Sequence, residues 1–262
     1  MNTVAGAVRT GSETARPILE VREVSKAFGH VQALIGVSFD MAAGETVALL
    51  GDNGAGKSTL VKILSGVHAA DDGDVLLDGI ALQLHSPTDA LHHGIGTVYQ
   101  DLAVVDTLDV ARNIYLGNVP RSFGFVVDYG SMYRNARQVL SLLRVNMPSV
   151  HTKVGELSGG QRQAVAIART LAQSARVLLL DEPTAALGVA QSEKVNELIA
   201  DLKQHGKTIL VISHNMEHIF QVADRLVVLR HGRRVGIRHR SETTREEIVG
   251  LITGAIKGDE PN

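Results

Sequence analysis

The spacing of hydrophobic and polar positions changes several times along the chain, and each change predicts a different element. From Pro17 onward, β-rich runs such as ILEVREVSKAF and VSFDMAAGETVALLG are interrupted by glycine, which is typical of short strands. The run DVLLDGIAL predicts a hairpin that turns at Asp78-Gly79. The first part of the folded chain is therefore expected to be a mixed, β-rich segment.

Three other apolar runs are nearly unbroken: TVALLG, ARVLLLDEP and GKTILVISHN. Helical patterns separate them, and this alternation is typical of a parallel sheet that is covered on both faces. Between Gln100 and about Arg176 the pattern turns helical, with helices expected in DVARNIYLG, from Asp128 through MYRNARQVLSLLRV, and after LSGGQRQ. The sequence predicts an α/β core that carries an inserted helical block.

The two ends of the chain differ from this core. Residues 1–16 are small, polar and aperiodic, which predicts a disordered tail, and 257–262 are expected to be a second tail. The folded domain is expected over 17–256. In its last helix, TTREEIVGLITG, Thr243 and Glu246 have the spacing of a capping box.

Composition narrows the class of protein. With 262 residues, 44% of them hydrophobic and 21% charged, the chain is expected to be an ordinary globular protein. The net charge of -2 gives no argument for a nucleic-acid partner, and the absence of cysteine excludes disulfides and thiolate chemistry. No segment reaches the roughly 18 consecutive apolar residues of a spanning helix, and the N-terminus lacks the apolar core of a secretory signal. We therefore expect a cytoplasmic protein that meets a membrane only from outside the bilayer.

The stretch GDNGAGKS carries the clearest candidate chemistry. It matches G-x-x-x-x-G-K-[ST] and lies between an apolar strand and a helix, the context of a phosphate-binding loop. Backbone N–H groups and the helix N-terminus would face the phosphates, Lys57 would pair with the β- and γ-phosphates, Ser58 would ligate Mg²⁺ and Thr59 would donate to phosphate. The alternative is a glycine-rich turn that only joins strand to helix. The candidate nucleotide-binding residues of this loop are Gly51, Asp52, Asn53, Gly54, Ala55, Gly56, Lys57, Ser58 and Thr59.

Carboxylates follow a second apolar run, in VLLLDEP. Asp181 and Glu182 are expected at the carboxyl end of a strand, where open α/β sheets bind their ligands. Asp181 would hold Mg²⁺, and Glu182 would orient and polarise the attacking water as general base. His214 also follows a core strand and is a candidate contact to the γ-phosphate. Gln100 ends another strand, from which it would reach Mg²⁺ or the water.

The phosphate loop, Gln100, LSGGQ, VLLLDEP and SHN occur in this order, and together they resemble the nucleotide-binding subunit of an ABC transporter. The resemblance covers roughly residues 18–255. It implies an ATPase with an α/β, P-loop NTPase (RecA-like) core, an antiparallel β subdomain and an inserted α-helical subdomain at about 101–175. ATP and Mg²⁺ are the implied cofactors, with no other metal.

The resemblance also assigns roles to residues. It implies that Gln100 is the Q-loop glutamine and His214 the switch histidine, and that Phe28 stacks on adenine, although Phe28 equally fits the apolar alternation of a strand. The segment from Leu102 to Leu108 is implied to help dock a permease. The implied signature, which contacts ATP held by an opposite copy, is Ser158, Gly159, Gly160 and Gln161. The predicted catalytic residues are Glu182, His214, Lys57 and Gln100, and the predicted Mg²⁺ ligands are Ser58, Gln100 and Asp181.

Three segments, VYQDLAVVDTLDVARNIYLG, EPTAALGVAQ and GLITG, are similar to importers of monosaccharides such as ribose, xylose or fructose. The similarity implies that two identical copies lie under a dimeric permease at the cytoplasmic face of the plasma membrane. An extracytoplasmic sugar-binding protein is expected to deliver the sugar to the permease, and no nucleic-acid partner is expected. One position departs from the family: Gly188 stands where most members have an aspartate that contacts the other subunit. Sugar specificity is expected to lie in the partners.

A second hypothesis stays open at this stage. The same ATP-driven switch would serve a soluble ABC protein that acts as a scaffold or assembly factor, for example in iron–sulphur cluster assembly. Two further patterns have simpler interpretations. The basic run from Arg230 to Arg240 predicts an exposed hairpin at His231-Gly232 rather than a lipid contact. The remaining candidate ligands, His85, His92 and His93, are expected to be surface residues.

Overall fold

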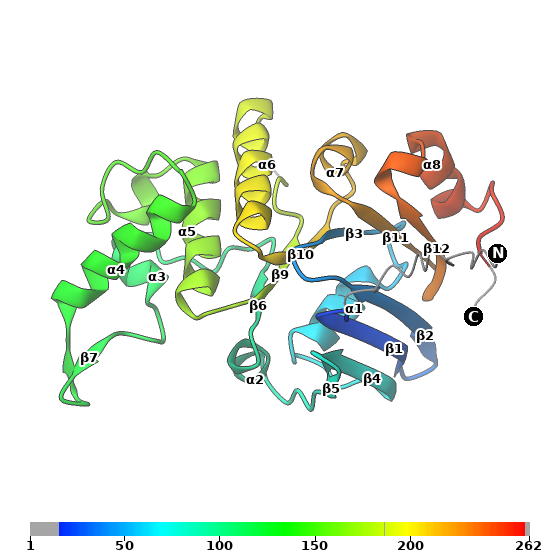
Figure 1. Cartoon of the computed structure of the whole chain (residues 1–262), viewed down its shortest axis with the longest axis horizontal. Coiled ribbons are helices and arrows are strands. Elements are labelled where there is room, and N and C mark those ends of the chain that lie inside the picture. Colours follow the sequence, from blue (N-terminus) through cyan, green and yellow to red (C-terminus); the bar gives the residue numbers. More distant parts are fainter. Residues whose placement is uncertain (1–15, 186, 260–262) are drawn as a thin grey trace, which may run out of the picture.

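Six strands form the central sheet of this computed structural model, which describes residues 16–185 and 187–259 (Figure 1). In sheet order they are β12 (Arg233–His239), β11 (Arg225–Arg230), β3 (Thr46–Leu50), β10 (Thr208–Ile212), β9 (Val177–Asp181) and β6 (Ile95–Val98). The pairs from β11 to β6 are parallel, and β12 joins β11 in antiparallel. The predicted parallel sheet is confirmed. The predicted tails fall largely on residues 1–15 and 260–262, which lie outside the described residues.

Both faces of the inner strands β3, β9 and β10 are buried, which explains their apolar runs. In β3, Ala48 and Leu50 face one hydrophobic cluster, while Val47 and Leu49 face the other. The first cluster includes α6 (Val189–Gln204), α7 (Met216–Val222) and α8 (Arg245–Thr253), and the second includes α1 (Lys57–Leu64) and a further sheet (Figure 1). Because side chains alternate along a strand, a strand covered on both faces requires apolar residues at nearly every position.

The second sheet is antiparallel and has the order β2 (Val31–Met41), β1 (Leu19–Phe28), β4 (Asp72–Leu77), β5 (Ile80–Ala81). The predicted hairpin at Asp78-Gly79 joins β4 to β5, and both turn residues have positive φ, as a two-residue hairpin turn requires. The hairpin predicted at His231-Gly232 likewise joins β11 to β12. The short helix α2 (Pro87–His92) leads from the second sheet into β6.

The chain between β6 and β9 forms the helical block, which extends to the left in Figure 1. It contains α3 (Val110–Ile114), α4 (Tyr129–Leu142), a short 3-10 turn (Val154–Glu156) and α5 (Gly159–Ala172). Asp128 caps α4 by accepting from the Ser131 N–H at 2.9 Å, so this helix begins where the sequence predicted.

Two details of the fold differ from the sequence prediction. A hairpin of β7 (Arg121–Ser122) and β8 (Val126–Val127) projects from the helical block, and strands of two residues are too short to show an alternating pattern. The last helix is capped by Thr244, which accepts from the Glu247 N–H at 3.2 Å, so the predicted Thr243–Glu246 box was wrong by one residue. Both pairs have the same spacing, and Thr244 is the cap because its own backbone is still extended, with φ −113° and ψ 163°, so that the helix begins at Arg245.

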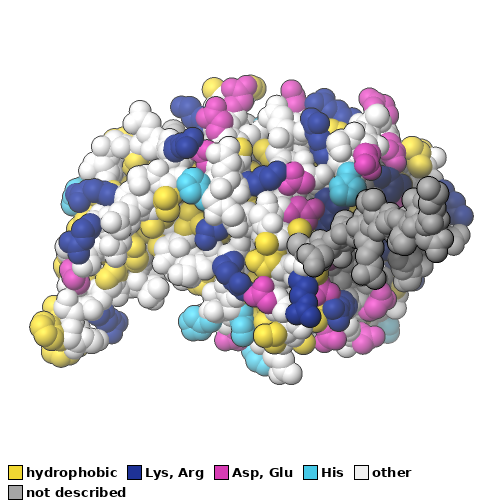
Figure 2. Space-filling model, viewed as in Figure 1, with side chains coloured by type: hydrophobic (Ala, Val, Ile, Leu, Met, Phe, Trp, Pro, Cys, Tyr) yellow, Lys and Arg dark blue, Asp and Glu magenta, His cyan; other side chains and the backbone are white. Residues whose placement is uncertain are grey.

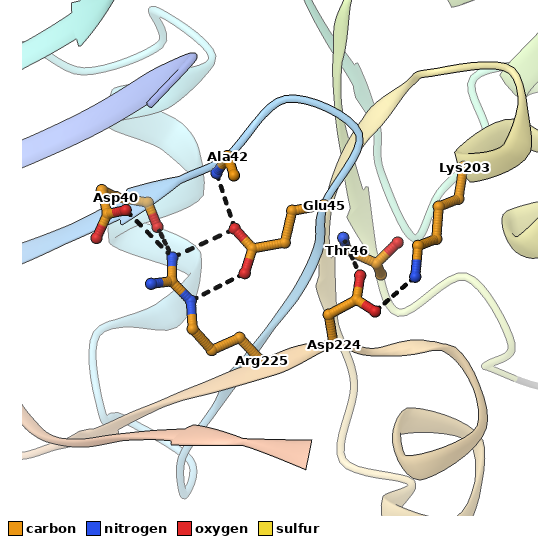
Figure 3. Close-up of polar contacts among 7 residues, drawn as sticks. All are labelled: Asp40, Ala42, Glu45, Thr46, Lys203, Asp224 and Arg225. Atoms are coloured by element: carbon orange, nitrogen blue, oxygen red, sulfur yellow. Dashed lines mark hydrogen bonds and ion pairs between the residues drawn. The ribbon is translucent and has the colours of Figure 1, made fainter. Parts of the chain in front are cut away.

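Arg225 ties the two sheets together at the first residue of β11 (Figure 3). Its guanidinium forms an ion pair with Glu45, with Nε and Oε1 2.9 Å apart, and donates to the backbone carbonyl of Asp40 at the end of β2. Glu45 in turn accepts from the Ala42 N–H at 2.8 Å. The loop between β2 and β3 is thereby fixed at the entrance to the central sheet.

A second carboxylate lies beside this network. Asp224 accepts from the Thr46 N–H at 2.9 Å and from the Lys203 ammonium of α6 (Figure 3). It therefore links the start of β3 to the end of α6 and to the start of β11.

Replacing Arg225 by methionine should lower the free energy of unfolding by roughly 3 kcal/mol, measured by urea denaturation. The side chains of Arg225 and Glu45 are each only 14% exposed, so the substitution leaves a mostly buried carboxylate without its cation. The matched control is Arg22→Met, because Arg22 is 57% exposed in its pair with Glu20 and should contribute less than about 1 kcal/mol. Equal losses in the two variants would contradict this account.

Candidate functional site

Three strands end together at one edge of the central sheet. The ladder pairs Ile212 of β10 with Leu49 of β3 and with Asp181 of β9, so the carboxyl ends of these strands are level. The phosphate loop follows β3, Glu182 follows β9, and His214 follows β10 after one intervening residue. Ligands of open α/β sheets bind at this edge. The structure thus brings the phosphate loop, the two carboxylates and the histidine to one side of the sheet.

The phosphate loop fits its surroundings only with glycine at particular positions. Gly56 precedes α1 with φ 105°, and a Cβ there would lie 2.6 Å from the Ala33 carbonyl oxygen and 2.7 Å from Leu34 Cδ2. A Cβ on Gly51 would lie 2.4 Å from the Leu229 carbonyl oxygen. The loop is therefore closely packed against β2 and β11, and backbone contacts fix its path.

Lys57 lies back over this loop. Its Nζ donates to the carbonyl oxygens of Gly51 at 2.8 Å and Asp52 at 2.9 Å. Burial lowers the pKa of Lys57, and the negative charges of Glu182, Asp52 and Asp181 oppose that shift. Ser58, the next residue, is exposed in the first turn of α1. The ammonium is held at the loop by two neutral carbonyl acceptors. Charged phosphate oxygens would accept stronger hydrogen bonds from it and would take the place of these carbonyls.

The adjacent carboxylates Asp181 and Glu182 have different surroundings. Burial raises the pKa of Asp181, the charge of Glu182 raises it further, and Lys57 and Lys62 oppose the shift. Such a half-buried carboxylate gains from a nearby cation. Glu182 instead contacts His214, with Oε1 and Nδ1 2.9 Å apart, and its carboxylate is 16% exposed while the histidine side chain is 78% exposed.

The backbone of Glu182 is strained. Its φ is +50°, a region that residues with side chains rarely adopt, and its N–H donates to the Ile212 carbonyl at 2.8 Å. The neighbouring strand β10 therefore holds this conformation in place. Strained residues concentrate at functional sites, and this one is the predicted general base.

Gln100 and Phe28 have exposed positions. Gln100 lies two residues beyond β6 and is exposed. Phe28 ends β1 and is 45% exposed, so the alternation of the strand does not bury it in the core. Its ring meets the His68 ring edge to face, with centroids 5.3 Å apart, and the Lys26 ammonium lies 5.7 Å from its centroid. His68 was missed by the sequence analysis, because no motif surrounds it.

The signature segment lies elsewhere, at the start of α5 in the helical block. Ser158 and Gln161 form a capping box: the Ser158 N–H donates to Gln161 Oε1 at 3.0 Å, and the Gln161 N–H donates to Ser158 Oγ at 3.4 Å. Gln161 Nε2 also donates to the Asn146 carbonyl at 2.9 Å. A Cβ on Gly159 would lie 2.6 Å from Leu187 Cδ2. Asn146 belongs to no sequence motif, and Leu187 lies in EPTAALGVAQ without an assigned role, so both contacts were missed.

Gly188 occupies the position of the usual aspartate. It is the N-cap of α6, with φ −72° and ψ 164°, and its N–H donates to Gln191 Oε1 at 3.3 Å. No atom lies within 4 Å of a Cβ built there, so the backbone itself would accept an aspartate. The missing carboxylate is therefore not required by packing within one chain.

A polar pair of one buried and one half-buried residue connects the segment after Gln100 to the signature helix. Arg169 of α5 donates through Nε to the Asn113 carbonyl at 2.8 Å and through Nη1 to the Ala103 carbonyl at 3.1 Å. Asn113 is fully buried, and its amide exchanges hydrogen bonds with both backbone groups of Val105. Burial lowers the pKa of Arg169. These residues join the segment after Gln100 to α5, and the sequence did not indicate that they are in contact.

The described residues also bear on the three surface histidines, on metal sites and on membrane-spanning helices. His85, His92 and His93 are exposed, as predicted. Among the described residues, no group of three or more His, Cys, Asp or Glu side chains is arranged to hold a metal ion. Within the same ranges, every helix is too short or too polar to cross a membrane.

The sheet order and the phosphate loop define a P-loop NTPase, and comparisons with known proteins give the family. Residues 34–185 match the family model described as ABC transporter. The chain is 45% identical to a xylose/arabinose import ATP-binding protein of Sulfolobus acidocaldarius, over 92% of this chain and 96% of that protein. It is 43% identical to a fructose import ATP-binding protein of Rhizobium meliloti, over 91% of this chain and 95% of that protein.

A ribose import ATP-binding protein of Chromobacterium violaceum is 46% identical over 91% of this chain, which spans only 47% of that protein's length. Among solved structures, the ADP conformation of an ATP-binding cassette of an ABC transporter matches with a TM-score of 0.79 and 27% identity, over 91% of this chain and 96% of that one. The fold prediction is confirmed. The chain belongs to the ABC transporter family and is its ATP-binding, ATP-hydrolysing subunit.

Replacing Gly56 by alanine should weaken ATP binding by more than about tenfold, because the new methyl group meets the Ala33 carbonyl and displaces the loop. Binding can be titrated with a fluorescent ATP analogue. Gly79→Ala is the matched control: it imposes the same kind of strain, about 1 kcal/mol, at φ 79° in open space within a distant hairpin. Its ATP affinity should equal that of the wild type. Unchanged affinity in Gly56→Ala would show that the loop does not need this packing.

Proposed function

We propose that this chain is the ATPase subunit of a monosaccharide importer and works as a pair of identical copies beneath a separate permease. The relatives named above are import ATP-binding proteins for xylose and arabinose, for fructose and for ribose, and each is at least 43% identical over at least 91% of this chain. These names favour import over the assembly-factor hypothesis. The subunit would lie at the cytoplasmic face of the plasma membrane, and an extracytoplasmic binding protein would deliver the sugar.

One observation carries this proposal: the two halves of the ATPase machinery lie apart within a single chain. The phosphate loop, Glu182 and His214 share the edge of the central sheet, whereas Ser158 begins α5 in the helical block and contacts its own helix. Two copies arranged head to tail would place each Ser158 segment over the phosphate loop of the other. A solved structure of an ATP-binding cassette, dimeric in a post-hydrolysis state with ADP and Pi, resembles this chain with a TM-score of 0.71 and 27% identity, which supports pairing.

Mg²⁺ fits the residues available at this edge. The candidate ligands are the hydroxyl of Ser58, the carboxylate of Asp181 and the amide carbonyl of Gln100. All three supply oxygen atoms, which Mg²⁺ prefers as ligands. The raised pKa of Asp181 marks a half-buried carboxylate that a cation would stabilise in its charged form. When bound, the ion would neutralise charge on the β- and γ-phosphates.

The remaining roles follow from the positions of the chain's own side chains. Lys57 would turn from the Gly51 and Asp52 carbonyls to the phosphates and stabilise the charge that develops there. Glu182 would accept a hydrogen bond from the attacking water and polarise it. His214 touches Glu182 and exposes most of its ring, so it would orient this base and reach toward the γ-phosphate.

The test is to reconstitute the subunit with its permease and binding protein and to measure ATP hydrolysis with different monosaccharides. One monosaccharide should stimulate hydrolysis severalfold. Glu182→Gln should still bind ATP but hydrolyse it at least about 100-fold more slowly, because the base is lost, and should accumulate as an ATP-bound pair.

Glu193→Gln is the matched control, since Glu193 is exposed on α6, and its hydrolysis should equal that of the wild type. Full turnover in Glu182→Gln would remove this residue from the role of base. Recovery of the subunit in the soluble fraction with an assembly partner, and without membranes, would overturn the importer assignment.

A further inference from the structure

The hairpin β7–β8 ends in an apolar tip that no part of the described chain covers. Phe123 is 92% exposed and Phe125 is 79% exposed, the two highest values for large hydrophobic side chains among the described residues. Val126 and Tyr129 beside them are 50% and 51% exposed. Figure 2 shows hydrophobic side chains gathered at the projecting end of the molecule, at the lower left. The chain has only five phenylalanines, so two of them on one exposed turn call for a physical reason.

The backbone of this exposed turn is strained. Phe123 has φ +53°, and Gly124 follows with φ +81°. The first of these positions suits glycine or asparagine, and a bulky side chain there costs on the order of 1–2 kcal/mol. An exposed phenyl ring recovers none of this energy within the chain. The stability of the folded chain therefore does not account for Phe123.

The base of the hairpin is firmly held. Asp128 accepts from the Ser122 hydroxyl at 3.3 Å and from the Ser131 N–H at 2.9 Å, and its own N–H donates to the Pro120 carbonyl at 2.9 Å. These contacts join both strands of the hairpin to the first turn of α4. The aromatic tip is thus presented from a defined base rather than from a loose loop.

The charge of this region is positive. Residues 109–155 contain two carboxylates besides Glu-free stretches of basic and neutral residues. Asp128 is engaged in the hydrogen bonds just described, and Asp109 forms an ion pair with Arg112, with Oδ2 and Nε 3.6 Å apart. The same segment contains six basic residues: Arg112, Arg121, Arg134, Arg137, Arg144 and Lys153. The whole chain has a net charge of -2, so positive charge is concentrated in the helical block.

Three of these arginines lie around the tip. Arg121 is exposed in β7, the Arg112 guanidinium lies 5.8 Å from the centroid of the Tyr129 ring, and Arg134 donates to the Ser131 hydroxyl at 2.8 Å. Exposed aromatic rings next to arginines match the interface of an anionic bilayer. Aromatic rings enter the region between headgroups and acyl chains, and guanidinium groups pair with lipid phosphates.

We propose that residues 120–129 insert their aromatic tip into the interface of a membrane that contains anionic lipid. This contact would hold the helical block against the bilayer beside the permease. It rests on the proposed function in one respect, that the subunit works at a membrane. A single small tip of this kind binds weakly and reversibly, so it would orient the subunit rather than anchor it.

The test is sedimentation of the full chain with vesicles of phosphatidylglycerol and phosphatidylcholine in equal parts. The wild type should bind these vesicles, should bind pure phosphatidylcholine much less, and should be released by added salt. The double variant Phe123→Ser with Phe125→Ser should lower the partition coefficient by at least roughly tenfold, because it removes both rings from the contact. The matched control is Ile80→Ser with Val249→Ser, which alters two exposed apolar residues far from the tip and should bind like the wild type.

Absence of binding to the anionic vesicles, or equal binding by the tip variant, would overturn the proposal. If the tip variant binds vesicles like the wild type but no longer assembles onto the permease, the tip contacts the permease instead, and the proposal is also overturned. The tip variant should keep the wild-type rate of ATP hydrolysis without membranes, which shows that it folds. Vesicle binding requires neither hydrolysis nor sugar, so Glu182→Gln should bind vesicles normally even if the importer assignment fails.

Discussion

The parallel pairing of β3, β10 and β9 is the constraint on which the rest of the structure depends. Level strand ends bring a lysine loop, two carboxylates and a histidine to one edge from segments up to about 160 residues apart in the chain. The pairing holds because both faces of each strand are buried against separate hydrophobic clusters. A shift of one residue in register would exchange the two faces and would also move Glu182 away from the carbonyl of Ile212.

In this structure the key polar groups of the phosphate-loop site and of the signature segment are paired with groups of the same chain. Lys57 is held by carbonyls of its own loop, Glu182 by His214, and Ser158 by Gln161 of its own helix. ATP and a second copy would replace these internal partners with phosphate and with each other. A ligand shifts a conformational equilibrium only through such differences in interaction, so these exchanges are where the energy for a transport cycle would arise.

The sequence was informative wherever chemistry and local pattern coincide. The run from Thr46 to Thr59 shows its strand, its glycines and its helix within fourteen residues, so the loop was predicted residue by residue. The buried strands were predictable because each has an unbroken apolar pattern. The Thr244 cap was not, because two pairs with identical spacing compete in TTREE.

Contacts between distant segments were beyond sequence reasoning. Arg169 and Asn113 lie 56 residues apart, and their pairing depends on how α3 packs against α5. The β7–β8 hairpin escaped prediction because it is held by Asp128 rather than by a strand pattern. The site is therefore predictable in its motifs, whereas the polar contacts that position those motifs are not.

The central claim is that each ATP site is built from Lys57 of one copy and Ser158 of the other. It is tested most directly by mixing two inactive variants, Lys57→Ala and Ser158→Arg, and measuring ATP hydrolysis by the mixture. A mixed pair restores one intact site, because the first variant supplies Ser158 and the second supplies Lys57. The account predicts that activity returns on mixing, to about a quarter of the wild-type rate if copies pair at random and the two sites act independently. A mixture that stays as inactive as its components, although mixed pairs form, would contradict the shared site.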